Sequence, residues 1–284
     1  MARFLTADTA LLAVGGMHAH NNPMALVREV VRQGRRVRRL LTSPCAALNA
    51  DLLLTAGLVD EIVTSYVGFE HLGLAPGFRR AVEGHTVRLL ECDEAALTHG
   101  LYAGAAGLPF IPLPPGLEVS DVPGINPDAY RPVRDPFGDR TVVAVPPLRP
   151  DLAFVHALEA DAAGNAVFGG AAFTDRLMAL AARRVVVQVE RVVPGERIAV
   201  HPAGTTIPGF LVQAVVEAPG GCHPTASHGA YAADEDHLRE YLALAREPEG
   251  AATYLRRYVT GGSEDQYRRT VAAPAGAFGA EVGR

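Results

Sequence analysis

The segment ALLAVGG at residues 10–16, followed by Pro23 and ALVREVVRQG at residues 25–34, decides the fold. The first part is a short apolar run that ends in two glycines, which indicates a buried strand and its turn. The second part predicts a helix over Met24–Gln33, because proline is favoured near the start of a helix and Gly34 ends it. A buried strand that leads directly into a helix is the repeating unit of a parallel α/β sheet.

The same strand–helix unit recurs along the first 107 residues. Strands are expected at residues 38–42, 61–67 and 86–91, each followed by a helix, at residues 46–56, 76–83 and 93–106. These units predict an open, mostly parallel sheet with helices on both faces. Ligands of such sheets bind outside the carboxyl ends of the strands. A site is therefore expected in the segments that follow the strands, residues 15–22, 43–45, 65–69 and 91–94.

The second half of the chain continues the pattern after an interruption. Residues 108–140 are rich in proline and predict a long loop, a lid or a partner contact. The sheet is expected to resume at residues 141–145, 152–156 and 184–190, with a helix over 173–182 and a further apolar segment at 209–217. A helical segment is expected over about 234–273, and a flexible tail over 274–284. We expect residues 1–273 to form a single α/β domain.

The composition excludes several classes of function. The chain has 284 residues and a formal net charge of −5, and all 26 of its Lys plus Arg residues are arginine. Without lysine it cannot use a lysine Schiff base, a Walker-type phosphate lysine or a carbamylated-lysine metal bridge. A mildly acidic chain without a basic tail is not expected to bind nucleic acid. No apolar run is long enough for a transmembrane helix, so no membrane association is expected.

The cysteines and the N-terminus point to one compartment. Cys45, Cys92 and Cys222 are far apart and form no CxxC motif, so they are expected to be reduced thiols. The first residues lack the charged region, long apolar run and small-residue cleavage site of a signal peptide. A cytoplasmic protein is therefore expected.

Two motifs follow the first strand. His18 and His20 form an HxH pair, which can bind zinc when further ligands are near. We expect polar loop residues close to a substrate or a partner instead, and no metal. Gly15 and Gly16 could cradle an acyl or phosphate group with their backbone N–H groups, or could simply form the turn.

A group of acidic residues follows the fourth strand. Asp93 is placed to cap the next helix, since a carboxylate there accepts bonds from the free N–H groups of the first turn. Glu94 then lies in that first turn, facing the crevice at the strand ends. It either acts as a base there or only contributes to the favourable charge at the helix start.

Two further histidines have simpler interpretations. His156 lies in an apolar strand, where a hydrogen-bonded core or crevice histidine is expected. Cys222 and His223 are adjacent in the segment APGGCHP, whose prolines and glycines indicate a rigid turn. Nucleophile and base usually come from segments far apart in sequence, so this pair is not expected to act as one.

These segments together resemble the A (α) subunits of class I CoA-transferases, of the glutaconate and 3-oxoadipate type. The resemblance covers roughly residues 10–270. It is carried by the glycine pair and its following proline (14–23), by GLYAGAAGLPFIPL (100–113), by VVAVPPLRPDLAFVHALEADAAGN (142–165) and by VEAPGGCHPTASHGAY (216–231). The pattern PDxAxxHxxxADxxGN followed by APGGxHP is specific as a set.

The resemblance implies an open parallel α/β sheet of the CoA-transferase type, also described as NagB/RpiA-like. It implies a protein that is active with a B subunit, as an αβ or α2β2 heteromer, with the nucleophilic glutamate on the B chain. A coenzyme A thioester would be the substrate, with no permanently bound cofactor. The related steroid ring-opening hydrolases imply an alternative, in which Glu94 carries out the chemistry.

The substrate-binding residues are expected at the strand ends. They are Gly15, Gly16, His18, His20, Asn21, Ser65, Gly68 and Phe69. Some glutaconate-type relatives have Arg-Lys before the proline of the first loop, where this chain has Asn21 and Asn22. Two neutral amides suit a ketone or hydroxyl better than a second carboxylate. A ligand sensor of similar fold is the alternative from another class, but no helix-turn-helix segment or basic face is evident.

Overall fold

A mostly parallel sheet forms the centre of the molecule. The computed structural model describes residues 4–201 and 204–271. In this part of the chain eight strands form one sheet, in the order β13-β12-β10-β1-β2-β4-β6, with β11 paired to β10. The strands are β1 (Leu11–Val14), β2 (Val37–Thr42), β4 (Val59–Thr64), β6 (Arg88–Glu91), β10 (Leu152–Ala160), β11 (Ala166–Val167), β12 (Val185–Val192) and β13 (Val212–Glu217). Every pairing along this order is parallel, and only β10–β11 is antiparallel.

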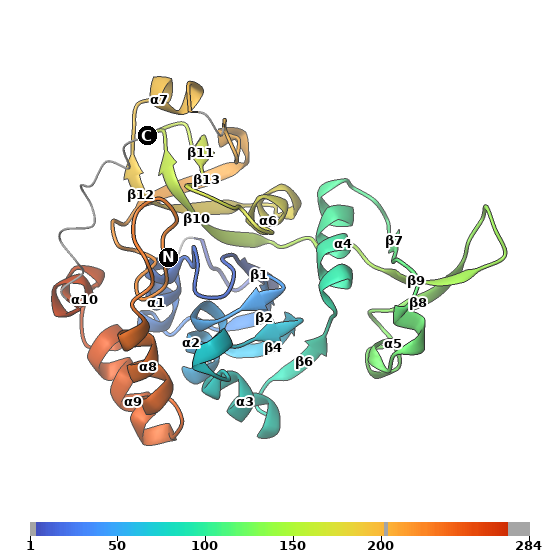
Figure 1. Ribbon diagram of the computed structural model, residues 1–284, viewed down its shortest axis with the longest axis horizontal. Helices are drawn as coiled ribbons and strands as arrows, with labels where there is room; N and C mark the ends of the chain where they lie inside the picture. The colour runs from blue at the N-terminus through green and yellow to red at the C-terminus, as the bar shows by residue number, and fades with distance from the viewer. Residues whose placement is uncertain (1–3, 202–203, 272–284) are drawn as a thin grey trace.

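Helices cover both faces of the sheet, as the sequence predicts (Figure 1). One layer contains α1 (Met24–Arg32), α2 (Leu48–Thr55) and α3 (Pro76–Glu83), whose apolar side chains share one core with the sheet. The opposite layer contains α4 (Glu94–Ala105) and α6 (Asp175–Ala181), which pack over a second core. The open α/β fold is thereby confirmed, and the predicted helices and strands of residues 10–107 lie within a few residues of their expected bounds.

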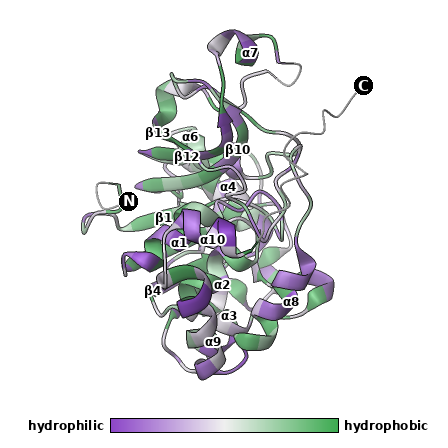
Figure 2. Cartoon of the chain, turned by 90° about the vertical axis from the view of Figure 1, so that its left-hand side faces the viewer, coloured by the Kyte–Doolittle hydropathy of each residue, from purple (hydrophilic) through white to green (hydrophobic). Residues whose placement is uncertain are grey.

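The core follows from the hydropathy of the strands. Because a parallel sheet is buried on both faces, its strands are nearly continuous apolar runs. The strands at the centre are coloured hydrophobic in Figure 2, and the surface helices carry the hydrophilic stretches. β1 lies between β10 and β2, with Leu12 aligned to both Leu152 and Leu40. The first half of the chain therefore adds β2, β4 and β6 on one side of β1, and the second half adds β10, β12 and β13 on the other side.

Residues 108–145, which we call the arm, differ from the prediction. They were expected to be a loop followed by a strand of the main sheet. Instead β9 (Thr141–Val145) pairs antiparallel with β7 (Ile111–Pro112) and β8 (Arg131–Arg134) in a separate three-stranded sheet. The 3-10 turn η2 (Leu117–Val119) and the short helix α5 (Val122–Ile125) complete the arm. It projects from the body beside α4 (Figure 1).

The smaller elements complete the strand ends and the surface. β3 (Cys45–Ala46) and β5 (Tyr66–Val67) form a two-stranded parallel pair just beyond β2 and β4. The turns η1 (Glu70–Leu72) and η3 (Gly209–Leu211) and helix α7 (Gly195–Ala199) lie on the surface segments. Residues 161–165 form a turn in which the Asp161 carboxylate accepts bonds from the N–H groups of Ala163 and Asn165.

The expected C-terminal helical segment is present. It consists of α8 (Glu235–Leu244), α9 (Pro248–Leu255), a π-helical stretch η4 (Arg256–Thr260) and α10 (Glu264–Thr270). These helices pack on the layer of α1 and α2. The tail expected at residues 274–284 lies outside the described residues. Within residues 4–201 and 204–271, no helix is both long enough and apolar enough to cross a bilayer.

Candidate active site

The loop that follows β1 is held from below by a buried carboxylate. Gly15 donates its N–H to Phe154 O at 2.8 Å, and Gly16 donates to both carboxylate oxygens of Asp175, at 2.9 and 3.1 Å. A Cβ at Gly15 would lie 2.6 Å from that carboxyl group. Both N–H groups are thus already bonded within the chain, as the turn alternative requires, and substrate binding by Gly15 and Gly16 stays a prediction. The glycines are needed because the backbone approaches Asp175 closely.

Asp175 is fully buried at the start of α6. Burial raises the pKa of its carboxyl group to about 7, although the Gly16 N–H acts to lower it. A carboxylate removed from water is destabilised unless partners replace its hydration, and here one N–H serves both oxygens. The end of β1 is therefore fixed by a group that titrates near neutral pH.

The HxH loop is tied to a segment far along the chain. Asn21 is buried; its Oδ1 accepts from the His228 N–H at 2.9 Å and its own N–H donates to Ala226 O at 2.7 Å. The His20 ring lies 4.9 Å from the ring of His228. Asn21 therefore shapes the loop through its bonds within the chain, and its role in substrate binding stays a prediction. The Nδ1 atoms of His18 and His20 are buried without a hydrogen-bond partner among the described residues.

One hollow of about 470 Å³ lies at the carboxyl ends of β2, β4 and β6. It brings together three of the residues expected from sequence, His18, Ser65 and Glu94. Its lining is His18, Cys45, Ser65, Tyr66, Glu91, Cys92, Asp93, Glu94 and Val122. We call it the strand-end pocket. Val122 belongs to α5, so the arm forms part of its wall.

Two other expected residues do not face this pocket. Phe69 is buried in the core with its ring 5.9 Å from that of Tyr241 and is not part of the pocket lining, so its role in substrate binding stays a prediction without support from this geometry. Gly68 packs against the ring of Tyr66, where any Cβ would collide. Ser65 lines the pocket, but its hydroxyl donates to Pro44 O. The apolar side chain of Phe69 is the feature of the sequence that indicates a position in the core.

The acidic group after β6 has the arrangement expected from its sequence. Asp93 caps α4, since its Oδ1 accepts from the Ala96 N–H at 2.7 Å. Glu94 is the first residue of the helix, and its side chain is exposed at the pocket.

Cys45 also lines the pocket, although it was not among the binding residues expected from sequence. Its only signal was its place in a segment that follows a strand. Burial raises the pKa of the Cys45 thiol, and the nearby carboxylates of Glu94 and Glu70 raise it further. That thiol is protonated at neutral pH and is a poor nucleophile.

A buried hydrogen-bond chain lies beneath the loop. His156, in β10, contacts Gln188 Nε2 through Nδ1 at 3.0 Å and Ser227 Oγ through Nε2 at 2.9 Å. Gln188 Oε1 accepts from the N–H groups at the start of α1, so its amide nitrogen donates to His156. Burial lowers the pKa of His156 to about 3, so the ring is neutral. The prediction of a hydrogen-bonded core histidine is confirmed.

Two groups of potential metal ligands lie in the described part of the chain: His156 with Glu190 and Cys222, and His223 with Asp234 and His237. In the first group Glu190 accepts from the Gly220 N–H at 2.7 Å and from the Tyr231 hydroxyl at 3.0 Å. In the second, His223 bonds Asp234 and Tyr267, and His237 bonds Tyr254. Both groups are hydrogen-bonded polar networks, buried except for Asp234, and none of their residues is part of the lining of the strand-end pocket. Cys222 and His223 do not form a nucleophile–base pair, because each belongs to a different network.

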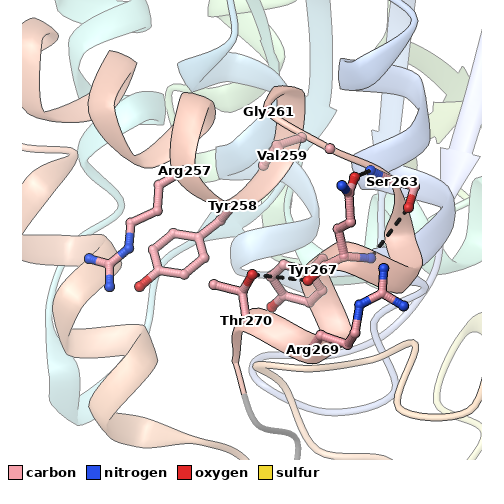
Figure 3. Close-up of a pocket in the computed structure, with 10 residues that line it drawn as sticks. Arg257, Tyr258, Val259, Gly261, Ser263, Tyr267, Arg269 and Thr270 are labelled. Atoms are coloured by element: carbon pink, nitrogen blue, oxygen red, sulfur yellow. Dashed lines mark hydrogen bonds between the residues drawn. The ribbon is translucent and has the colours of Figure 1, made fainter.

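A second hollow lies between η4 and α10 and has no lining residue in common with the strand-end pocket (Figure 3). Arg257 and Arg269 flank it. Its hydrogen bonds serve the helix: Ser263 N–H donates to Gln266 Oε1 at 2.7 Å, and the Gln266 N–H donates to Ser263 Oγ. This reciprocal capping explains the polar lining without a ligand.

The fold and the strand-end pocket define a class of protein, an open α/β chain with an acidic site at the strand ends. Among the described residues that line this pocket, the Cys45 thiol is protonated and the Ser65 hydroxyl donates to a main-chain oxygen, so neither is paired with a base. Within that class the chain belongs to the coenzyme A transferase family, whose model matches residues 2–218.

Relatives and a solved structure extend the match along the chain. The chain is 33% identical to the A (α) component of the 3-oxoadipate CoA-transferase of Pseudomonas knackmussii, over 85% of each chain. It is 35% identical to the cholesterol ring-cleaving hydrolase IpdA subunit of Rhodococcus jostii, over 92% of this chain and 90% of the relative. The structure of glutaconate coenzyme A-transferase from Acidaminococcus fermentans superposes with a TM-score of 0.87 at 26% identity, covering 98% of this chain and 95% of the other. An uncharacterized protein of Archaeoglobus fulgidus is 37% identical over 89% of this chain, and there the chain spans 56% of the relative's length.

Proposed function

We propose that this chain is the A (α) subunit of a two-subunit acyl-CoA enzyme that transfers coenzyme A between carboxylic acids. In this proposal a glutamate of the B chain attacks the acyl-CoA and carries CoA as a glutamyl thioester. One observation supports it above the others. The strand-end pocket is open and lined by carboxylates, yet its thiol is protonated and the N–H groups of Gly15 and Gly16 are already bonded. Such a half-site needs a second chain to supply the nucleophile.

The same pocket bears on how the substrate binds. No arginine is among the residues that line it in the described chain. The phosphates of CoA are anionic and need cationic or N–H partners. We therefore place only the acyl end of the thioester in this pocket, as a substrate and not as a resident cofactor. His18, with its buried unpartnered Nδ1, is the residue that we propose to contact the acyl group.

The assembly that we propose is an αβ or α2β2 heteromer in the cytoplasm. The 3-oxoadipate and glutaconate relatives are named as A components of their enzymes, which supports a B partner. The three cysteines are free thiols, which suits a reducing compartment.

The test is co-expression with the B-type CoA-transferase chain of the same genome. The purified complex is incubated with an acyl-CoA and then with hydroxylamine or borohydride. Modification of a B-chain glutamate, located by mass spectrometry, is the expected result. A complex that releases CoA-linked ring-opened product with no trapped glutamate would contradict transfer.

Hydrolytic opening of a cyclic oxo-acyl-CoA is the second candidate. It is favoured by Glu94, an exposed carboxylate in the strand-end pocket, and by the 35% identity to the ring-cleaving hydrolase of Rhodococcus jostii. In that reaction Glu94 would activate the water.

Glu94→Gln separates the two reactions. Under CoA transfer, we expect kcat/KM of the complex to fall less than tenfold, because the nucleophile is on the other chain. Under hydrolysis, we expect a loss of about 10³-fold or more with substrate binding retained. Glu91→Gln, in the same pocket, is the matched control, and helix capping by Asp93 is untouched in both variants.

A further inference from the structure

The arm has an anchored base and an uncovered outer part. At the base, Leu113, Tyr130 and Val143 are buried in the core that α4 shares with the sheet. Asn126 fixes α5 beside the strand-end pocket, because its Nδ2 donates to the main-chain oxygen of Glu91 at 3.1 Å. The base is therefore a fixed platform at the mouth of this pocket, and not a free loop.

Large apolar side chains are exposed at several positions along the arm. Phe110 is 50% exposed, Val119 88%, Ile125 62% and Phe137 97%. Single exposed apolar residues are normal on a protein surface. Here four lie on one projection that extends away from the body (Figure 1). Their transfer from water is unfavourable in the isolated chain and becomes favourable when a partner covers them.

The charge around the pocket mouth has one sign. The pocket presents Glu91, Asp93 and Glu94, and η2 and α5 are flanked by Glu118 and Asp121. Residues 108–130 contain no basic side chain.

The arm has three arginines, and two of them are paired with its own acids. Arg131 lies 3.4 Å from Asp128, and Arg134 lies 3.5 Å from Asp139. The third, Arg140, interacts electrostatically with Glu118. The lining of the pocket holds three carboxylates and no arginine, so the charge of the pocket itself is negative. A chain that docks there must bring cations around an apolar centre.

We propose that the arm is the docking surface for the B chain, which would present an apolar face bordered by arginine or lysine and would close the strand-end pocket against α5. This inference rests on the proposed function, since it assigns the surface by which the proposed partner binds. Because Val122 of α5 lines the same pocket as Glu94, a chain that contacts α5 would lie at the mouth of this pocket. The same contact would therefore bury the apolar arm and complete the site.

The experiment compares two highly exposed phenylalanines, Phe137 and Phe210. Phe137→Asp changes the arm, and Phe210→Asp changes a residue that is 87% exposed in η3, on a different part of the surface. Ile125→Asp is added to the first variant to remove a second contact. Association with the B chain is measured by titration calorimetry, and circular dichroism confirms that each variant is folded.

We expect the Phe137→Asp/Ile125→Asp variant to bind the B chain at least tenfold more weakly, while Phe210→Asp binds as wild type does. We also expect wild-type affinity to fall as NaCl is raised from about 50 to 500 mM, because the complementary charges are screened. Asp121→Asn should reduce that salt dependence.

The possible failures are distinguishable. If wild type binds the B chain and the arm variant binds equally well, the docking surface is wrong and the proposed function stands. If wild type binds no B chain, both fail. If the arm variant loses only self-association, the arm is a contact between copies of this chain, and the assignment to the B chain is overturned.

Discussion

Asp175 shows at the scale of one residue how the site loop is held. Its carboxylate is fully buried and accepts from a single N–H, that of Gly16. Burial raises its pKa from 3.8 to about 7. Between these two values the folded chain holds a proton that the unfolded chain has lost. The contribution of this carboxyl group to the free energy of unfolding is therefore greatest below pH 3.8, and it is lost as the pH rises through about 7.

Asp175→Asn should remove this pH dependence. Asn keeps an acceptor for the Gly16 N–H but carries no charge to desolvate. We expect the free energy of unfolding of wild type, relative to the variant, to fall by a few kcal/mol between about pH 4 and pH 8. Urea denaturation at several pH values measures it. Asp128→Asn, whose side chain is 88% exposed, is the control. If the free energies of unfolding of wild type and Asp175→Asn changed with pH in parallel, the Asp175 carboxylate would be ionised over this whole pH range.

Part of the site could be predicted from residues that follow strands. His18, Ser65, Asp93 and Glu94 each come directly after a strand, and the parallel order puts such segments at one edge. Asp175 could not be found in this way. It is 159 positions from Gly16, and only the packing of α6 under β1 brings the two together. The buried bond between Asn21 and the His228 N–H could not be found in this way either, because the two residues are 207 positions apart.

At the scale of elements, the strand–helix units were predictable because each is local. A strand of four to six apolar residues and an amphipathic helix leave their period in the sequence. The arm leaves no such signal. β7 has two residues and β8 contains Pro132, and both become strands only by pairing with β9. Pairing partners that are distant in sequence are not encoded by local propensity, so the segment looked like a loop and β9 like part of the main sheet.

The start of α4 supports a prediction at this scale. Asp93 accepts from the Ala96 N–H and so fixes the first turn, which begins with Glu94. Asp93→Ala should lower the free energy of unfolding by about 1 kcal/mol. Asp93→Asn, which keeps a capping oxygen, should cost much less. Chemical denaturation of both variants is the measurement. Equal losses in the two variants would mean that the charge of Asp93, and not its capping bond, stabilises this end of the helix.

At the scale of the whole molecule, a buried cation joins the first helix to the last. Arg28 of α1 is 2% exposed and its guanidinium lies 3.8 Å from the ring centre of Tyr267 in α10. It donates to His223 O at 2.6 Å and pairs with Glu264. The sequence showed α1 and the C-terminal helices separately. Their junction depends on Arg28, but an arginine on a helix is equally compatible with an exposed position. The sequence therefore did not predict the junction.

Arg28→Met tests whether this junction stabilises the whole chain. Methionine fills similar space, but it leaves Glu264 with Arg32 as its remaining partner and the His223 carbonyl with only the Tyr267 hydroxyl as a donor. Breaking a buried ion pair from one side costs about 3–5 kcal/mol, so we expect a loss of that order in urea denaturation, with earlier protease cleavage between α9 and α10. Replacing both partners, as Arg28→Met/Glu264→Met, should recover much of the loss, because no charge is then left unpaired. Arg36→Met breaks the exposed pair with Asp60 and should change stability by less than about 1 kcal/mol. A loss at Arg28 no larger than that at Arg36 would mean that aromatic packing alone holds the C-terminal helices in place.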